Sequence, residues 1–349
     1  MLLTRLRRLA RGSGSGYTPA LGPVDMAGFE PDAAGLSEAG AEIVESPGGG
    51  LRAIPVGSPC GSAFTCFLDG IQQADVALYR DGVPIVYAYA AAVVRVRRAG
   101  RMSTFRGSPG DVGSAGRAAF TTRAAGPAPS GAPYVVEREA AIFPFRFVDP
   151  AEIAAAVPDV SVIDSGQPDD EPLPLFPPLL YARAAAAVNR LREGLEAGLA
   201  RRWCAEAPAG EWLLVDGSLT LCPELAACGR AVGVIKSHRT RFFDGDDARI
   251  LLGLEVGERT SVFRPLTREH TPVYSWYLRL RSPAGRDGLW GLVRVEAAAD
   301  PSTLERADEI SRWILAETVP LPLPDPRWDR LLYPIRNCEE YLRSRAPGL

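Results

Sequence analysis

Two apolar runs in the sequence each lead directly to an aspartate that is followed by glycine. Residues 63–68 precede Asp69, and residues 212–215 precede Asp216. A carboxylate at the end of a buried strand is unfavourable unless a cation compensates its charge. If the two strands are neighbours, the aspartates would repel each other, and a shared divalent metal ion would remove that repulsion. Because Asp-Gly is also a common turn dipeptide, either aspartate alone could be a turn residue.

A long helical pattern at residues 179–203 offers a further acidic ligand. Glu193 and Glu196 lie three residues apart within it and therefore share a face. Oxygen ligands of this kind favour Mn²⁺ or Mg²⁺ over zinc. Two such ions about 3.5–4 Å apart can activate a water and neutralise a phosphate during phosphodiester hydrolysis. The same spacing also fits a solvated helix face with intrahelical ion pairs.

A single lysine stands in a chain whose other basic side chains are arginines. Lys236 follows the apolar run 231–235, where it could offer a compact positive charge to a scissile phosphate. His238, Arg239 and Arg241 come next and could contact the phosphates of a nucleic-acid strand. A solvated basic turn is the alternative interpretation of this segment.

The hydrophobic pattern predicts the elements that must position these side chains. A hairpin is expected where residues 75–79 meet residues 83–96 across Asp81-Gly82, since both turn residues tolerate positive φ. Further strands are expected at 63–68, 212–215, 231–235, 273–281 and 289–296, and further helices at 246–254, 302–317 and 335–345. Hairpin-connected strands followed by strands that alternate with helices predict an α/β fold with one mixed sheet and helices on its faces.

Composition limits the class of protein. The chain has 349 residues, 46% of them hydrophobic, and 39 Lys+Arg against 42 Asp+Glu, which excludes a disordered chain and argues against a nucleic-acid coat protein. No stretch approaches the roughly 18–20 apolar residues of a membrane span. The basic segment 1–16 lacks the pattern of an export signal and predicts a frayed tail or a short docking helix. Six cysteines without a CxxC pair are expected to be reduced and mostly buried, and the cytoplasm is the expected compartment.

Gly-, Pro- and Ser-rich stretches separate the predicted elements. They fall at residues 11–60, 100–133, 158–178 and 320–326 and predict irregular structure or functional loops. No Gly-x-Ser-x-Gly elbow, credible Cys/His pair or phosphate-binding glycine loop is present, so covalent catalysis and nucleotide binding are not indicated.

Several short motifs in order along the chain resemble those of the NurA family of DNA-end-processing nucleases. They are FLDG at 67–70, EWLLVDGSL at 211–219, VGVIKS at 232–237, VYSWYLRL at 273–280, VRVE at 293–296 and LYP at 332–334. The resemblance implies a ribonuclease-H-like mixed β-sheet flanked by helices, a homodimer, and Mn²⁺- or Mg²⁺-dependent hydrolysis of DNA with two ions. It also implies a hexameric HerA-type ATPase as partner. On this basis residues 51–349 form the nuclease domain and residues 1–50 an N-terminal segment that could dock a partner.

The resemblance also assigns roles to residues. Asp69 and Asp216 correspond to the metal-binding aspartates, and the helical glutamate corresponds to Glu196, with Glu193 as the alternative. Lys236, Glu296 and one tyrosine correspond to the remaining polar positions of the catalytic site. Tyr274 and Tyr277 are three residues apart on one expected strand, so they point to opposite faces and at most one of them reaches the site.

One departure from the family pattern concerns the C-terminal segment. A histidine usually follows the terminal Tyr-Pro in the family, whereas this chain reads Ile-Arg-Asn337-Cys-Glu-Glu. The expected function is 5′–3′ exonuclease or single-strand endonuclease activity in DNA end resection and double-strand break repair. The missing histidine leaves an alternative: a catalytically weakened NurA-like subunit that binds DNA or plugs an ATPase ring, for instance in defence against foreign DNA. A metal-dependent ribonuclease on the same fold is a third reading.

Overall fold

The structure is a computed structural model, and it describes residues 1–10, 16–20, 37–46, 48–106, 132–166, 174–267, 271–319 and 328–348. All structural statements below concern these residues. Most of the predicted loop at 100–133, part of the acidic link at 158–178, much of 11–60 and the Pro-rich segment 320–326 lie outside them. Within the described part of the chain, no helix is both long and apolar enough to cross a membrane.

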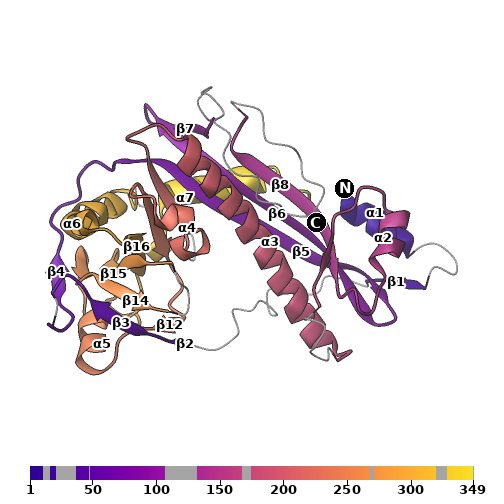
Figure 1. The fold of residues 1–349 in the computed structure, drawn as a ribbon, viewed down its shortest axis with the longest axis horizontal. Helices are drawn as coiled ribbons and strands as arrows, with labels where there is room; N and C mark the ends of the chain where they lie inside the picture. Colours follow the sequence, from indigo (N-terminus) through magenta and orange to yellow (C-terminus); the bar gives the residue numbers. More distant parts are fainter. Residues whose placement is uncertain are drawn as a thin grey trace.

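One large mixed sheet forms the centre of the described residues (Figure 1). Its main path runs β3-β14-β15-β16-β11-β10-β5-β6-β8-β9, and β1, β4, β7 and β13 pair at its margins. The strands of the main path are β3 (Gly40–Ile43), β14 (Phe263–Leu266), β15 (Val273–Arg279), β16 (Leu292–Ala298), β11 (Ala231–Ile235), β10 (Trp212–Asp216), β5 (Phe64–Arg80), β6 (Val83–Arg98), β8 (Val135–Phe143) and β9 (Val162–Asp164).

The remaining elements lie around this path. The marginal strands are β1 (Tyr17–Pro19), β4 (Ala53–Pro55), β7 (Arg101–Thr104) and β13 (Glu258–Thr260), and β2 (Ser37–Glu38) pairs separately with β12 (Thr240–Arg241). The helices are α1 (Leu2–Leu9), α2 (Pro150–Ala156), α3 (Pro177–Glu206), α4 (Pro223–Ala226), α5 (Gly245–Leu252), α6 (Pro301–Ala316) and α7 (Tyr333–Arg343), with short 3₁₀ turns η3 (Leu219–Leu221) and η4 (Trp328–Arg330). The predicted fold class, a mixed β-sheet flanked by helices, is confirmed.

The predicted hairpin is present, but its first strand is longer than expected. β5 and β6 meet at Asp81 and Gly82, which have φ of 51° and 82° as the turn requires. The expectation that a strand stops at Asp69 is wrong, since Asp69 lies inside β5 and pairs with Val93 of β6. The long apolar strand β6 is a continuous hydrogen-bonding partner for β5. The polar residues after Asp69 therefore also pair with β6. Gly70 does not have a positive φ, so no turn forms there.

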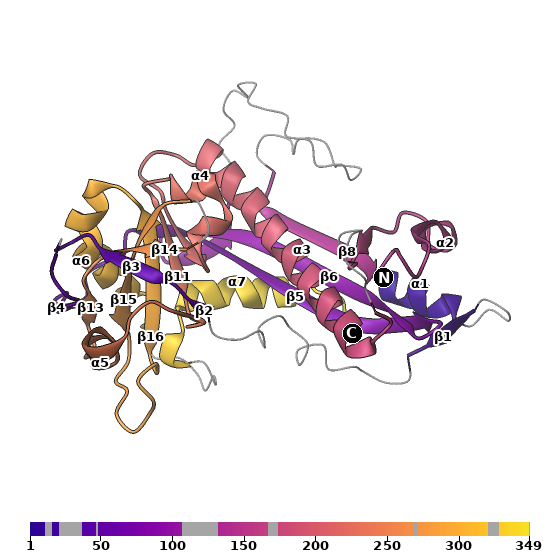
Figure 2. The same ribbon diagram turned by 60° about the horizontal axis from the view of Figure 1, so that its bottom comes forward.

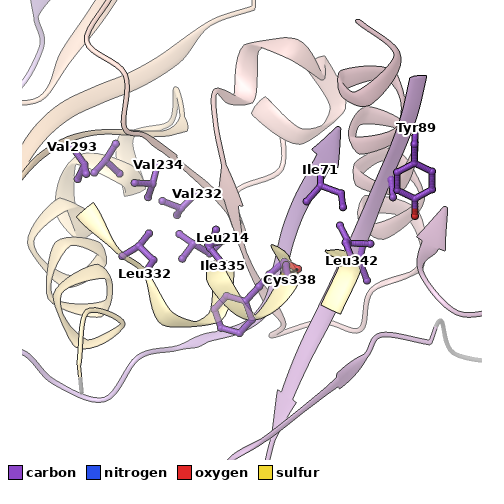
Figure 3. Packing of buried hydrophobic residues seen from close by; sticks show 14 of the residues in the cluster. Ile71, Tyr89, Leu214, Val232, Val234, Val293, Leu332, Ile335, Cys338 and Leu342 are labelled. Carbon is purple, nitrogen blue, oxygen red and sulfur yellow. Dashed lines mark hydrogen bonds between the residues drawn. The ribbon is translucent and has the colours of Figure 1, made fainter. Parts of the chain in front are cut away.

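Helices cover both faces of the sheet (Figure 2). α3 crosses one face of β5 and β6, where Leu195 and Leu199 pack against Leu213 and Val215 of β10. α6 and α7 cover the opposite face. Figure 3 shows the packing of α7, in which Ile335 lies beside Leu214 of β10 and Val232 of β11, while Leu342 lies nearer Ile71 of β5 and Tyr89 of β6. Side chains alternate along a strand, so successive residues of β10 face α7 and α3 in turn.

The described part of the first fifty residues belongs to the same fold. α1 buries Leu2, Leu3 and Leu6 in the core, and Arg7 forms an ion pair with Asp75 of β5 at 2.6 Å. The segment expected as a frayed tail or docking helix is therefore a helix with a buried apolar face. The domain boundary at residue 50 stays a prediction. The cysteines are all unpaired, and three of the six are buried.

Candidate metal centre

Three carboxylates converge where α7 crosses the central parallel strands. Asp69 lies on β5, Asp216 ends β10, and Glu339 lies on α7; one carboxylate oxygen from each lies within 4.8 Å of the other two. β5 and β10 are parallel neighbours, and Val215 lies opposite Leu68. The next residues along the two strands, Asp216 and Asp69, therefore lie at the same level of the sheet. The expectation that the two aspartates come together is met by this register.

Glu339 was missed by sequence reasoning, which sought the third ligand on the long helix. Its position is set by the packing of α7, whose residues Ile335, Cys338 and Leu342 are buried against the sheet. The Cys338 thiol donates to the carbonyl of Phe67 at 3.5 Å, two residues before Asp69. The signal in the sequence is the spacing of these three apolar residues, which places Glu339 at the border of the buried face.

Arg95 of β6 fixes the same helix from the side. Its Nε donates to Oδ1 of Asn337 at 3.2 Å, and its guanidinium lies 4.4 Å from the ring centre of Tyr341. Its other nitrogens donate to Thr104 and to the carbonyl of Met102. Asn337, in the segment where the family pattern has a histidine, therefore anchors α7 to β6.

The buried carboxylate of Asp69 has little positive charge around it. Asp69 is 5% exposed, its Oδ1 accepts from the backbone N–H of Gly70 at 2.8 Å, and its buried Oδ2 has no hydrogen-bond partner. Burial raises the pKa of Asp69 well above its usual range, the negative charges of Asp216 and Glu196 raise it further, and Lys236 opposes them. The Lys236 ammonium lies 2.9 Å from both carboxylate oxygens of Asp216.

These residues fit a divalent cation. Carboxylate oxygens are the ligands that Mn²⁺ and Mg²⁺ prefer, and an orphaned buried oxygen such as Oδ2 of Asp69 needs a positive partner. Lys236 pairs with Asp216 and Arg343 lies 3.9 Å from Glu339, whereas Asp69 forms no ion pair among the described residues. The geometry therefore supports a metal centre built by Asp69, Asp216 and Glu339 with Lys236 beside it.

Glu196 reaches β5 from the α3 face. Its Oε1 accepts from Arg192 at 2.6 Å and lies against Gly70, where a Cβ would collide with it. Burial raises the pKa of Glu196 to about 7, although Arg192 lowers it. Glu196 is not among the three residues whose oxygens converge, and Glu193 accepts a hydrogen bond from Asn189 at 2.7 Å. A ligand role for either glutamate stays a prediction.

Glu296 is placed behind the turn that follows Asp216. Its buried carboxylate accepts from Ser218 Oγ at 2.7 Å, from the backbone N–H of Leu219 at 2.9 Å and from Arg294 at 2.5 Å. These bonds hold residues just after Asp216, so Glu296 supports that turn.

The two tyrosines lie on β15, which is separated from β11 by β16. Tyr277 is buried, with ring centres of Phe263 and His238 at 5.9 and 5.8 Å. Tyr274 is half-buried and has the guanidinium of Arg264 5.9 Å from its ring centre. A catalytic role for Tyr274 stays a prediction.

The basic residues after Lys236 differ in their surroundings. His238 is largely enclosed, its Nε2 bonds to the carbonyl of Leu292 at 2.9 Å, and burial lowers its pKa. Arg241 is exposed and forms ion pairs with Glu38 and Asp244. The backbone carbonyl of Arg239 accepts from Ser37 at 2.9 Å. Nucleic-acid binding by these three residues stays a prediction.

Comparison with known proteins finds similarity among solved structures only. No protein-family model and no curated protein matches the chain. The crystal structure of the NurA nuclease from Sulfolobus solfataricus is similar with a TM-score of 0.44 and 13% sequence identity, over 84% of this chain and 82% of that chain.

Proposed function

We propose that this protein is a metal-dependent nuclease that hydrolyses phosphodiester bonds in DNA. The observation that carries the proposal is the convergence of Asp69, Asp216 and Glu339 within 4.8 Å, with Lys236 paired to Asp216. Hard oxygen ligands with an adjacent ammonium suit a reaction in which negative charge builds up on a phosphate.

Each residue has a defined part in this chemistry. Asp69, Asp216 and Glu339 would hold Mn²⁺ or Mg²⁺, and the bound metal would polarise the phosphate and lower the pKa of a water. Lys236 is already held at Asp216 and would contact a nonbridging oxygen of the phosphate as a compact charge. Asp69 would ligate the ion through its unpartnered Oδ2. Glu196, whose carboxylate lies against Gly70, is the candidate ligand for a second ion.

The substrate and partners follow from the motif resemblance. DNA ends as substrate, a homodimer, a HerA-type hexameric ATPase as partner, and a cytoplasmic role in end resection are parts of the proposal. The weakened-subunit alternative was motivated by the missing histidine. Glu339, two residues after Asn337 on the same helix, supplies an acidic ligand there and favours an active enzyme.

Metal binding and cleavage test the proposal with a matched pair of variants. Glu339→Gln should weaken Mn²⁺ binding at least tenfold in calorimetry and reduce cleavage of labelled linear DNA by about 100-fold, because a ligand is lost. Glu340→Gln is the control, since Glu340 is exposed and pairs with Arg336 at 2.8 Å. Absence of saturable Mn²⁺ binding by the unmodified protein would refute the proposal, and preferential cleavage of matched RNA would favour a ribonuclease.

A further inference from the structure

A small cavity opens beside the metal centre, at an edge of β5. Its volume is about 280 Å³, near the lower end of the roughly 300–1,000 Å³ of small-ligand sites. It is lined by residues 70–73 of β5, by Asn189 and Arg192 of α3, and by Glu339 and Arg343 of α7. Because Glu339 belongs to both, the cavity and the metal centre are contiguous.

The edge of β5 at this cavity pairs with no strand among the described residues. β10 pairs with β5 as far as Leu68, and β1 pairs with it only from Leu78 to Arg80, while β6 occupies the other edge throughout. Between these partners, alternate backbone N–H and C=O groups of β5 point outward without a ladder. An extended chain can therefore approach the metal centre along this edge.

Two buried polar groups beside the cavity lack partners. Gln73 lines the cavity, and its Oε1 is enclosed without a hydrogen bond. Tyr89 lies directly opposite Gln73 on β6, is 3% exposed, and its hydroxyl has no partner either. Cross-strand neighbours share a face of the sheet, here the face on which Figure 3 shows Tyr89 near Leu342 of α7. A ligand with a hydroxyl, an amino group or an imide N–H, such as the N3–H of thymine, would satisfy such an acceptor.

The cavity also carries positive charge. Arg343 ends α7 with its side chain 65% exposed, and its NH2 lies 3.9 Å from Oε2 of Glu339. A guanidinium at this distance from a metal ligand can bind the phosphate that follows the one at the metal. Arg192 lies on the α3 side of the cavity, fixed by Glu196 and Asn189.

We propose that this cavity binds the nucleotide adjacent to the scissile phosphate of a single-stranded nucleic acid, with Arg343 on its phosphate and Gln73 accepting a hydrogen bond from its base. The proposal rests on the proposed function for the identity of the strand. A peptide strand could also add to this edge of β5. It would use neither Arg343 nor the unpartnered oxygen of Gln73, and both of these residues lie in the cavity next to the metal centre.

Oligonucleotide binding by two variants tests this subsite. A fluorescein-labelled single-stranded oligodeoxythymidine is titrated by anisotropy in Ca²⁺, with strand integrity checked on a gel. Gln73→Leu should raise Kd about fivefold through loss of one hydrogen bond. Arg343→Gln should raise Kd and reduce the slope of log K against log salt by about 0.7, the value for one phosphate contact on a single strand.

Arg249→Gln is the matched control, because Arg249 is an exposed arginine on α5 that pairs with Asp246 at 2.8 Å; its Kd and salt slope should equal those of the unmodified protein. The subsite is refuted if the unmodified protein does not bind the strand, or if both test variants bind it equally well. The proposed function fails separately, if the unmodified protein binds the strand but Mn²⁺ does not induce its cleavage.

Discussion

At the scale of single residues, the unusual feature is the buried carboxylate of Asp69, which forms no ion pair among the described residues. Lys236 pairs with Asp216, while Oδ2 of Asp69 is enclosed without a partner among the described residues. An unpaired buried charge destabilises the fold, so such an arrangement persists only where function requires it.

Asp69 and Asp216 could be predicted from the sequence, since each follows an apolar run and strand alternation fixes the face on which it lies. Glu339 could not, because a helix face is assigned only once its packing partners are known.

His238 shows a residue whose surroundings give a prediction for pH. Its ring donates from Nε2 to Leu292, its Nδ1 is buried without a partner, and burial lowers its pKa. The neutral ring therefore stabilises the fold above the unfolded pKa of about 6.5, and this stability is lost as the pH falls through the lowered folded value. His238→Gln, which retains a donor to Leu292, should flatten the decline in Tm between pH 7 and pH 5 in calorimetry. An unchanged decline in this variant would show that other groups cause it.

At the scale of elements, α7 is the element that completes the metal centre. Its existence follows from sequence periodicity, since a helix was expected at 335–345 and α7 spans Tyr333–Arg343. Its location over β5 could not be read from that pattern. Similarly, Asp69-Gly70 predicts the end of a strand, whereas the register with β6 extends β5 beyond it to Arg80. In both cases a tertiary partner decides what the local sequence leaves open.

Arg95 gives a prediction about the positioning of α7. Arg95→Gln removes the hydrogen bond to Asn337 and the contact with Tyr341, so Glu339 is held less firmly and Mn²⁺ affinity should fall about tenfold in calorimetry. Arg101→Gln on the neighbouring strand β7 is the control, because Arg101 is exposed. Asn337→Ala should have a similar effect, and the double variant should be little weaker than either single one. Additive losses would show that the two residues act independently.

At the scale of the whole molecule, the metal centre depends on strands that are far apart in sequence. β5 and β10 are parallel neighbours although β6, β8 and α3 lie between them in the chain. The sequence predicts that strands and helices occur, and it predicts the class of fold. It cannot predict which strands become neighbours, since that order is decided by the combined packing of both helical layers. The centre is therefore a property of the assembled sheet, and its charges should influence global stability.

Global unfolding with and without metal tests that influence. Mn²⁺ at about 100 times its Kd should raise the free energy of unfolding by about 2.7 kcal/mol, because only the folded chain brings the three ligands together. Asp69→Asn removes one of the mutually repelling charges, so at pH 8 in EDTA this variant should have a higher Tm than the unmodified protein. In Mn²⁺ the order should reverse, because the variant lacks a ligand. Differential scanning calorimetry in the two buffers measures both orders, and a variant that is less stable in EDTA would show that Asp69 stabilises the fold without a metal.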